Sequence, residues 1–306
     1  MRWTNEQLSE PEELGSVYPV MGMFRRSFNQ PGVTADEAVP LPLGGSRCEA
    51  EEKLALVIPT LCEAENIGRL LDHVRSVIDP LGISYEILVV DDDSIDGTGA
   101  VVSAIAEKDP HVRLLVRKGE RGLSGAVLHG WQRSDATVLG VMDADLQHPP
   151  ELLPQLIAVI REGCDIAIGS RYTPGGELGA WNPFRKFLSA AAVWVTLPLQ
   201  RRGLRAKDPM SGYFMVRRRC LESIAFQRAG FKLLLEILVR SRIQSMKEVP
   251  FAFGQRYRGS SKANFKVAWD YGRLLARLYA GKIGFGRRTR GRGSAPKPLE
   301  RGQQQP

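Results

Sequence analysis

The sequence predicts an α/β fold in which helices flank a mainly parallel central sheet. Between about residues 53 and 170, short apolar runs alternate with longer segments of helical spacing. The apolar runs are continuous, which is typical of parallel strands buried on both faces. The intervening segments are long enough for the helical crossovers that join neighbouring parallel strands. Together these observations indicate successive strand–helix–strand units.

The expected elements of the first half follow from this alternation. The strands are short apolar runs, namely Leu54–Ile58, Glu86–Val90, Val112–Val116, Thr137–Met142 and Asp165–Gly169. The helices are the segments between them, namely Glu65–Ile78, Gly97–Lys108, Gly125–Arg133 and Pro149–Arg161. Prolines lie in the first turn of the last of these helices, where they are tolerated.

The second half is less regular, and both ends of the chain lack a sustained period. Helices are expected at Phe184–Gln200, Arg217–Ile224, Leu233–Ser241 and Phe265–Tyr279, and strands at Tyr213–Val216 and Lys247–Ala252. Residues 1–52 are rich in Pro, Gly and Glu, and residues 281–306 form a basic tail. We expect both ends to be poorly ordered, which leaves residues 53–280 as the main folded domain.

Composition and charge restrict the function classes only broadly. The chain has 306 residues and a net charge of +8, which favours an anionic partner such as a phosphorylated ligand, a membrane surface or nucleic acid. The 4 cysteines are widely spaced, so neither a disulfide framework nor a zinc site is expected. The most apolar stretch, Leu188–Leu199, is shorter than the roughly 18 residues that a membrane span needs, so we expect no transmembrane helix.

Acidic residues follow several of the expected strands. The second strand ends in Asp91-Asp92-Asp93, the fourth ends in Asp143-Ala144-Asp145, and Glu63 follows the first. In an open α/β sheet the carboxyl ends of the strands share the edge at which ligands bind. Clustered carboxylates repel one another, and oxygen ligands without His or Cys favour a hard cation such as Mg²⁺ or Mn²⁺. The sequence therefore predicts a metal site at this edge, with Gln147 near it.

Some of these acids have simpler explanations. Asp96 lies before a helix start and is expected to cap it. The spacing from Asp92 resembles the start of a calcium loop, but Ser103 stands where that loop needs a bidentate Glu, so calcium binding is rejected. Asp143 and Asp145 could be solvated loop acids, although they directly follow an apolar strand. His148 is expected to be structural.

Basic residues form two further groups. Arg171 follows the fifth expected strand at the same sheet edge, and residues 255–262 concentrate positive charge in a Gly/Ser-containing loop. That loop is either a solvated charge run or a mobile segment that closes over phosphates. The apolar stretch Leu188–Leu199 has basic residues on both sides, so it is either a buried helix or an interfacial helix at a membrane.

Several segments resemble family 2 glycosyltransferases and, more narrowly, dolichol-phosphate mannosyltransferases, also called polyprenol-monophosphomannose synthases. The most specific is the run Met142–Glu151 (MDADLQHPPE). The similarity covers about Lys53 to Tyr279. Further matching segments follow in the same order along the chain: Ile58–Thr60, Val89–Asp92, Ser170–Tyr172, Ser211–Tyr213, Gly230–Glu236, Glu248–Pro250, and Arg256 with Lys262.

The resemblance implies a GT-A fold, a GDP-mannose donor, a polyprenyl phosphate acceptor and a Mg²⁺ or Mn²⁺ cofactor. It also assigns residues to each part of the site. The residues expected to bind the donor are Pro59, Leu61, Glu63, Val90, Asp91, Asp92, Asp143, Ala144, Asp145, Arg171, Arg256 and Lys262. Those expected to hold the metal are Asp143, Asp145 and Gln147, and those expected to bind the acceptor phosphate are Arg171, Arg185 and Ser189. Mutation of Asp145 or Arg171 is expected to cost the most activity.

Three positions depart from the family pattern, and alternatives stay open. The first motif of the family reads Pro-Thr-Tyr-Asn-Glu, whereas this chain has Leu61 and Cys62 in place of the Tyr and Asn, and Asp93 stands where the family often has Asn. A same-fold transferase that uses a UDP sugar such as UDP-glucose is therefore one alternative. A nucleotide- or metal-binding module without activity is another. Specific nucleic-acid binding is not expected, because no aromatic platform or binding motif accompanies the basic tail.

The resemblance also implies a location and partners. The acceptor is a lipid, so the membrane surface is an expected partner and the cytoplasmic face of a membrane the expected location. Some family members carry C-terminal membrane spans, which are not expected here. The chain is similar to the members without spans, for which a small membrane-anchoring protein can be a further partner.

Overall fold

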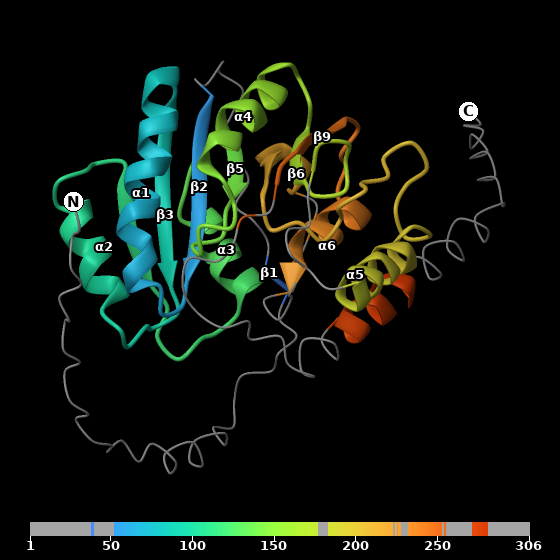
Figure 1. Cartoon of the computed structure of the whole chain (residues 1–306), viewed down its shortest axis with the longest axis horizontal. Coiled ribbons are helices and arrows are strands. Elements are labelled where there is room, and N and C mark those ends of the chain that lie inside the picture. Colours follow the sequence, from blue (N-terminus) through green and yellow to red (C-terminus); the bar gives the residue numbers. More distant parts are fainter. Residues whose placement is uncertain are drawn as a thin grey trace, which may run out of the picture. The chain divides into compact units, whose positions relative to one another are not determined.

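The central feature of the computed structural model is a mixed sheet with helices on both faces (Figure 1). The structure describes residues 52–176, 183–222, 224, 226–227, 232–252, 254 and 271–280, with the backbone alone for Ala38–Val39, 183–189 and Gln227. Within these residues the large sheet has the strand order β4-β3-β2-β5-β7-β6-β9. Its strands are β2 (Lys53–Thr60), β3 (Ser84–Asp91), β4 (Val112–Val116), β5 (Val138–Val141), β6 (Ile166–Ser170), β7 (Phe214–Arg217) and β9 (Met246–Pro250).

Most neighbouring strands of this sheet are parallel. β2 pairs in parallel with both β3 and β5, and β3 pairs with β4 in the same way. β7 runs antiparallel to β5 and to β6, and β6 pairs in parallel with β9. A separate antiparallel pair joins β1 (Ala38–Val39) to β8 (Phe226–Gln227). The predicted α/β fold with a mainly parallel sheet is confirmed, with β7 as its antiparallel strand.

Helices bury both faces of the sheet, as the continuous apolar strands require. The described helical segments are α1 (Ala64–Ile78), η1 (Asp79–Leu81), α2 (Thr98–Ala106), α3 (Leu123–Gln132), η2 (Pro150–Leu152), α4 (Leu153–Arg161), α5 (Pro183–Thr196), η3 (Arg218–Cys220), α6 (Leu233–Arg240) and residues 271–280. Along β2, Leu54 and Leu56 pack into the core with α1, α2 and α4, whereas Ala55 and Val57 pack into the core with α3 and α6. Successive residues of one strand therefore face opposite layers.

One predicted helix is wrong. The segment Arg217–Ile224 was expected to be helical, but β7 extends to Arg217 and is followed by the short η3 turn. The cause is tertiary, because the buried Arg218 guanidinium donates hydrogen bonds to the carbonyl oxygens of Trp131, Ser134 and Ala136. These bonds hold the chain against the end of α3, and the N–H groups of Leu221 and Ile224 donate to carbonyls three residues earlier, so the segment forms tight turns and no α-helix.

The remaining expectations about the whole chain have different outcomes. No helix within the described residues has the length and apolar character needed to cross a membrane. The predicted helix Phe265–Tyr279 lies partly outside the described residues, and residues 271–280 are helical. The domain boundaries at residues 52 and 280 stay predictions.

Candidate active site at the carboxyl edge of the sheet

The loop after β5 carries the acidic residues that the sequence singled out. Leu146 adopts a left-handed conformation with φ of 61°, which turns the chain between Asp145 and Gln147. The Gln147 backbone N–H donates to Asp145 Oδ1 at 3.2 Å. Gln147 is also tied to Gly254, because its side-chain Nε2 donates to the Gly254 carbonyl at 3.1 Å and its carbonyl accepts the Gly254 N–H at 3.0 Å. The loop is thus closed on itself and fastened to the segment that follows β9.

Asp143 has the electrostatic character of a cation ligand. Its Oδ1 is buried and has no hydrogen-bond partner within the described residues. Burial raises the pKa of this carboxyl, and the neighbouring Asp145 raises it further, while the positive charges of Lys232 and Arg171 act in the opposite direction. An unpartnered buried oxygen is costly to keep in a folded protein. A bound cation would satisfy it.

Gly212, in the segment that leads into β7, lies directly against Asp143. A Cβ atom at this position would lie 3.1 Å from Asp143 Oδ2 and 3.3 Å from Oδ1. The absence of a side chain therefore lets the backbone approach the carboxylate closely, which is a use of glycine next to ligand sites. The sequence reasoning did not identify Gly212 as a site residue.

The oxygen donors around Asp143 fit a hard divalent cation. Asp143 and Asp145 supply carboxylates, and the amide nitrogen of Gln147 is engaged by Gly254, which leaves the amide oxygen as the atom that could ligate. Within the described residues, no group of three or more His, Cys, Asp or Glu side chains is placed to hold a metal ion. The predicted set of two carboxylates and one amide matches the oxygen-rich, sparsely ligated sites that Mg²⁺ and Mn²⁺ use beside phosphates.

His148 supports this loop from inside the protein. Its ring is buried, stacks on Tyr213 with 4.9 Å between ring centroids, and meets Phe251 edge to face. Its Nδ1 accepts the backbone N–H of Asp143 at 3.1 Å, and burial lowers the pKa of the imidazole. His148 therefore fixes the backbone of the candidate metal ligand.

Arg171, directly after β6, is held by a carboxylate that the sequence reasoning missed. Its Nε donates to Asp208 Oδ2 at 2.7 Å, its Nη2 donates to Asp208 Oδ1 at 2.9 Å, and its backbone N–H donates to Oδ2 at 3.1 Å. Burial alone would lower the pKa of the guanidinium, but the hydrogen bonds and charge of Asp208 raise it. Asp208 is itself fully buried.

Lys232 is a second cation that the sequence reasoning did not place in the site. It lies at the start of α6, close enough to Arg171, Asp143 and Asp208 for their charges to act on it. Burial lowers the pKa of its ammonium group, and the charge of Arg171 lowers it further. The available signal was a lysine directly before an apolar helix in the segment Gly230–Glu236 that resembles the family.

The carboxylates after β3 are occupied by protein groups. Asp91 accepts hydrogen bonds from the Thr60 hydroxyl at 2.8 Å and from the Ser94 N–H at 2.8 Å. Asp92 forms a buried ion pair with Arg117, whose Nη2 lies 2.6 Å from Oδ1, and its Oδ2 accepts the Gly122 N–H at 2.8 Å. Both side chains therefore shape the loops beside the site.

Glu63 and Asp96 organise the ends of two helices at the same edge. Glu63 Oε2 accepts a hydrogen bond from Asn66 at 2.7 Å, and the Glu63 N–H donates to the Thr98 hydroxyl at 2.9 Å. Asp96 accepts from the N–H groups of Ala64 and Thr98, each at 3.0 Å, so it joins the first residues of α1 and α2, although Gly97 and not Asp96 occupies the N-cap position of α2. Burial opposes ionisation of Asp96, but these hydrogen bonds lower its pKa.

The other predicted donor-binding residues are less uniform. Val90 and Ala144 have buried side chains, and Val90 packs under α3 beside Gly130, so only its backbone could border a ligand. Pro59 and Leu61 are partly exposed around the end of β2. The side chains of Arg185, Ser189, Arg256 and Lys262 lie outside the described residues.

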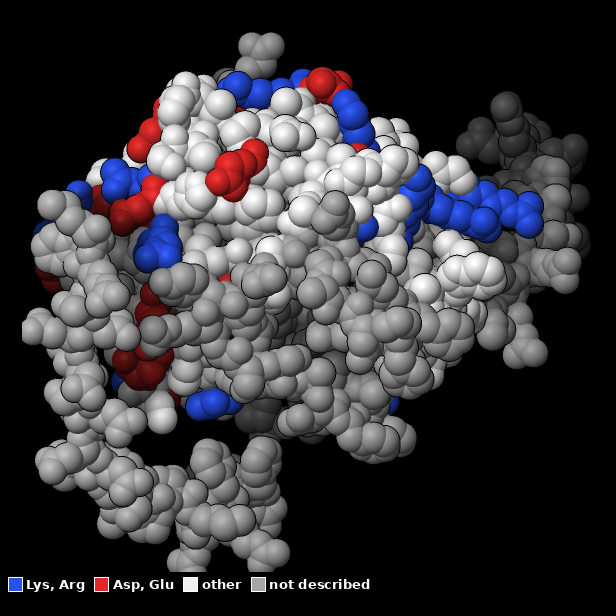
Figure 2. Space-filling view, viewed as in Figure 1, with Lys and Arg blue, Asp and Glu red and all other residues white. Residues whose placement is uncertain are grey.

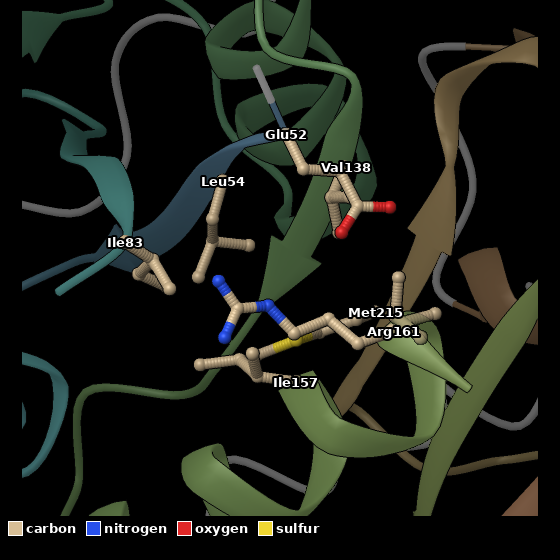
Figure 3. Close-up of a pocket in the computed structure, with 8 residues that line it drawn as sticks. Glu52, Leu54, Ile83, Val138, Ile157, Arg161 and Met215 are labelled. Carbon is tan, nitrogen blue, oxygen red and sulfur yellow. The ribbon is translucent and has the colours of Figure 1, made fainter. Parts of the chain in front are cut away.

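A pocket at the opposite edge of the sheet is separate from this site. It lies where β2 and β5 begin, and Arg161 reaches across it toward Leu54 and Ile83 (Figure 3). Its walls are mostly apolar and are formed by Glu52, Leu54, Ile83, Val138, Ile157, Ile160, Arg161 and Met215. The carboxylates discussed above are at the other ends of these strands.

Comparisons with known proteins agree with the fold and identify the family. The family model described as Glycosyl transferase family 2 matches residues 55–225. A dolichol-phosphate mannosyltransferase of Pyrococcus furiosus is 43% identical over 229 residues, which are 74% of this chain and 63% of that protein, so this chain spans less than two thirds of that relative. A dolichol-phosphate mannosyltransferase of Saccharomyces cerevisiae is 36% identical over 240 residues, which are 75% of this chain and 88% of that protein.

Solved structures show the same fold. The crystal structure of glucosyl-3-phosphoglycerate synthase from Mycobacterium tuberculosis with Mn²⁺, UDP-glucose and phosphoglyceric acid superimposes with a TM-score of 0.56 at 18% identity. The superposition covers 84% of this chain and 86% of that one. At this identity the likeness concerns the fold, and it confirms the expected GT-A architecture.

Proposed function

Because this chain belongs to glycosyl transferase family 2, we propose that it transfers mannose from GDP-mannose to a polyprenyl phosphate, giving polyprenyl-phosphate-mannose. The relatives named above as dolichol-phosphate mannosyltransferases support this donor sugar and this acceptor class. The observation that carries the proposal is the buried, unpartnered Oδ1 of Asp143, which lies among Asp145, Arg171 and Lys232. Carboxylates for a cation and cations for phosphates thus meet at the sheet edge where α/β proteins bind nucleotides.

The proposed reaction needs little proton transfer. The acceptor phosphate is already an anion near neutral pH, so no general base is assigned. A divalent cation held by Asp143, Asp145 and Gln147 would neutralise the negative charge of the leaving nucleotide diphosphate. In one displacement the acceptor oxygen bonds to the anomeric carbon as the bond to the diphosphate breaks, so an α-linked donor gives a β-linked product.

The residues of this chain contribute position and charge. Arg171 is rigid because Asp208 binds its guanidinium at two points, so it can hold a phosphate group without first losing side-chain freedom. Lys232 adds a positive charge within the same cluster. His148 accepts the backbone N–H of Asp143, and Gly212 lies against the Asp143 carboxylate, so both residues restrict the position of Asp143. Preorganised charges of this kind stabilise charge that develops during the reaction.

The donor is tested by competition. The protein is incubated with GDP-mannose that carries labelled mannose and with a polyprenyl phosphate in detergent. Mn²⁺ is present, together with an excess of either unlabelled GDP-mannose or unlabelled UDP-glucose. Formation of a labelled lipid that is suppressed by unlabelled GDP-mannose but not by UDP-glucose supports the proposal. Transfer from labelled UDP-glucose in its place would contradict the GDP-mannose donor and support the UDP-sugar alternative, for which Leu61 and Cys62 are the sequence motivation.

We also propose that the protein attaches peripherally to the cytoplasmic face of a membrane, with or without a small anchoring protein. Trp194 and Val195 at the end of α5 are 75% and 45% exposed. Helix 271–280 packs beside α5, since the hydroxyl groups of Tyr271 and Tyr279 each donate to a carbonyl of α5 at 2.6 Å. Basic side chains gather over the segment that follows α5 (Figure 2), and its exposed members are Arg201, Arg202, Arg205 and Lys207. An exposed Trp beside basic residues is the composition of an interfacial surface.

Vesicle co-sedimentation tests this attachment. The Trp194→Ser/Val195→Ser variant is expected to bind less to vesicles that contain anionic lipid than the wild-type protein does. The matched control is Ile95→Ser/Val116→Ser, because these two residues are 94% and 44% exposed but lie after β3 and at the end of β4. Equal binding of all three proteins would contradict the assigned surface.

A further inference from the structure

Asp208 and Glu248 form a chain of carboxylates behind Arg171. Asp208 receives three hydrogen bonds from Arg171, two from the guanidinium and one from the backbone N–H. Glu248 on β9 in turn receives the N–H of Asp208 on Oε1 and the N–H of Lys207 on Oε2, both at 3.0 Å. Both oxygens of each carboxylate are therefore used to fix the next group in the chain.

This arrangement is more than neutralisation of one buried charge. A guanidinium bound at two points by a planar carboxylate has a fixed plane as well as a fixed position. Asp208 is fully buried, and the Arg171 side chain is only 12% exposed, so solvent screens this pair weakly. Asp208 therefore determines which guanidinium edge faces the candidate site.

The charge of Asp208 also matters for the neighbouring cations. Arg171 and Lys232 are close enough for their like charges to act on each other, and this repulsion adds to burial in lowering the pKa of Lys232. Asp208 acts on Lys232 in the opposite direction. Without its negative charge, two partly buried cations would repel each other and move apart.

The segment from β9 to Gly254 reaches both sides of the site. At Glu248 it supports the loop that holds Arg171, and at Gly254 it makes two hydrogen bonds with Gln147. β9 itself is anchored in the sheet by its parallel pairing with β6, the strand that ends next to Arg171. Residues on both sides of the site, one proposed to hold phosphate and one proposed to hold the metal, are thus supported by contacts with β9 and Gly254.

We propose that Asp208 is a positioning residue for glycosyl transfer, that it acts through Arg171, and that Glu248 holds Asp208 in place. This inference rests on the proposed role of Arg171 in binding a phosphate group. It assigns no contact between Asp208 and either substrate. Its consequence is that loss of the Asp208 charge and loss of the Arg171 side chain damage the same interaction.

A double-mutant cycle tests this coupling. The four proteins are the wild type, Asp208→Asn, Arg171→Ala and the double variant, and kcat/KM for transfer is measured for each. A misplaced catalytic group costs about 10²-fold, so each single variant is expected to lose activity by about that factor. The double variant is expected to equal Arg171→Ala within about twofold, because Asp208 has nothing left to position.

A matched variant controls for general damage to the fold. Asp165 lies before β6, whereas Arg171 follows it, and Asp165 also binds an arginine, Arg219, at 2.9 Å and accepts two backbone N–H groups. Asp165→Asn is expected to lower the thermal midpoint but to keep the wild-type kcat/KM. The Mn²⁺ concentration that gives half-maximal rate is expected to be unchanged in Asp208→Asn, because the contacts of Asp143 and Asp145 are intact.

The outcomes separate this inference from the proposed function. Multiplicative losses in the double variant, or wild-type kcat/KM in Asp208→Asn, would overturn the inference. If the wild-type protein transfers no mannose to polyprenyl phosphate, the proposed function fails. The same four proteins are then compared by the dissociation constant of a nucleotide in the presence of Mn²⁺. The nucleotide is GDP or UDP, whichever binds the wild type. Equal weakening by the single and double variants in that cycle supports the positioning role, and additive weakening overturns it.

Discussion

At the scale of single residues, Gly212 decides how closely the segment before β7 approaches the Asp143 carboxylate. The Cβ of any other residue would lie 3.1 Å from Asp143 Oδ2, which is tighter than ordinary contact. Because the fold places this contact at a candidate metal ligand, a small displacement there changes the oxygen geometry that a cation requires.

Gly212→Ala is therefore expected to raise the Mn²⁺ concentration for half-maximal activity by about 10-fold. Changes to groups that orient a metal ligand weaken metal binding by about this factor. The measurement is initial rate against Mn²⁺ concentration. The matched control is Gly68→Ala in α1, where the new Cβ would lie 3.8 Å from Val101. That variant is expected to keep wild-type Mn²⁺ dependence and to gain about 0.5–1 kcal/mol of stability. Equal Mn²⁺ dependence in both variants would contradict the role of Gly212.

Cys62 is a second residue whose backbone conformation matters. Its φ is 59°, in the left-handed region that Asn tolerates better than most other residues with a side chain. The conformation is held from outside the side chain, because the Cys62 N–H donates to the Ser94 hydroxyl at 2.8 Å. An Asn at this position, as in the family pattern, would adopt the same left-handed conformation with less strain.

Cys62→Asn is expected to raise the free energy of unfolding by up to about 1 kcal/mol by relieving that strain. Cys62→Val is expected to lower it by at least about 1 kcal/mol, since a β-branched residue fits the left-handed region poorly. Chemical denaturation of the three proteins measures both changes. A Val variant as stable as the Asn variant would show that the backbone at this position is not left-handed.

At the scale of elements, β3 is fastened to its neighbours by the buried carboxylate of Glu86. This carboxylate lies 2.7 Å from Arg113 Nη1 on β4 and 3.2 Å from Lys53 Nζ at the start of β2, and it accepts a hydrogen bond from the Ser134 hydroxyl at 2.7 Å. Burial raises the pKa of Glu86, but these three partners together lower it below its ordinary value of 4.5. The ionised form is thus favoured by folding.

Glu86→Gln is expected to reduce the free energy of unfolding by about 1–3 kcal/mol at pH 7. A carboxyl whose pKa is lower in the folded state contributes stability above its unfolded pKa and loses it as the pH falls through the folded pKa. The difference between variant and wild type should therefore be full at pH 7 and should shrink as the pH falls below about 4.5. Urea denaturation over this range measures it, and a difference that does not change with pH would contradict the assigned charge.

The regular elements of the first half could be predicted because their causes are local. The predicted strand Val112–Val116 coincides with β4, and the predicted helix Glu65–Ile78 differs from α1 by one residue at its start. In α1, burial of one face imposes a periodic apolar pattern that is visible in the sequence, and β4 is recognisable as a short apolar run. The helix predicted at Arg217–Ile224 was wrong because contacts with α3, distant in sequence, determine that turn.

The candidate site was predictable only in part, for the same reason. Asp143 and Asp145 were found because the order of the strands brings carboxylates after β5 to a known edge of the sheet. Asp208 and Glu248 were missed because their partners are 37 and 40 residues away along the chain. No short spacing or local pattern marks a carboxylate that is used at such a distance.

At the scale of the whole molecule, the fold brings opposite charges to one edge of one sheet. β2, β3 and β5 are neighbours, so the carboxylates after them share that edge, and β6 and β9 bring Arg171 and Glu248 to it from the other half. The antiparallel strand β7 lies between these halves, and the segment that leads into it places Gly212 against Asp143. The central claim is that a divalent cation held at Asp143 and Asp145 is required for transfer of mannose to a lipid phosphate.

The most direct test is the rate of labelled mannosyl-lipid formation from GDP-mannose and a polyprenyl phosphate, measured with Mn²⁺, with chelator, and with Asp145→Ala. Asp93→Asn serves as the control, because it removes an exposed charge at the same edge and Asn tolerates the φ of 58° at that position. The account predicts product with Mn²⁺ in the wild type and in Asp93→Asn, and at least a 10²-fold loss with chelator or in Asp145→Ala. Undiminished transfer by Asp145→Ala, or in the presence of chelator, would contradict it.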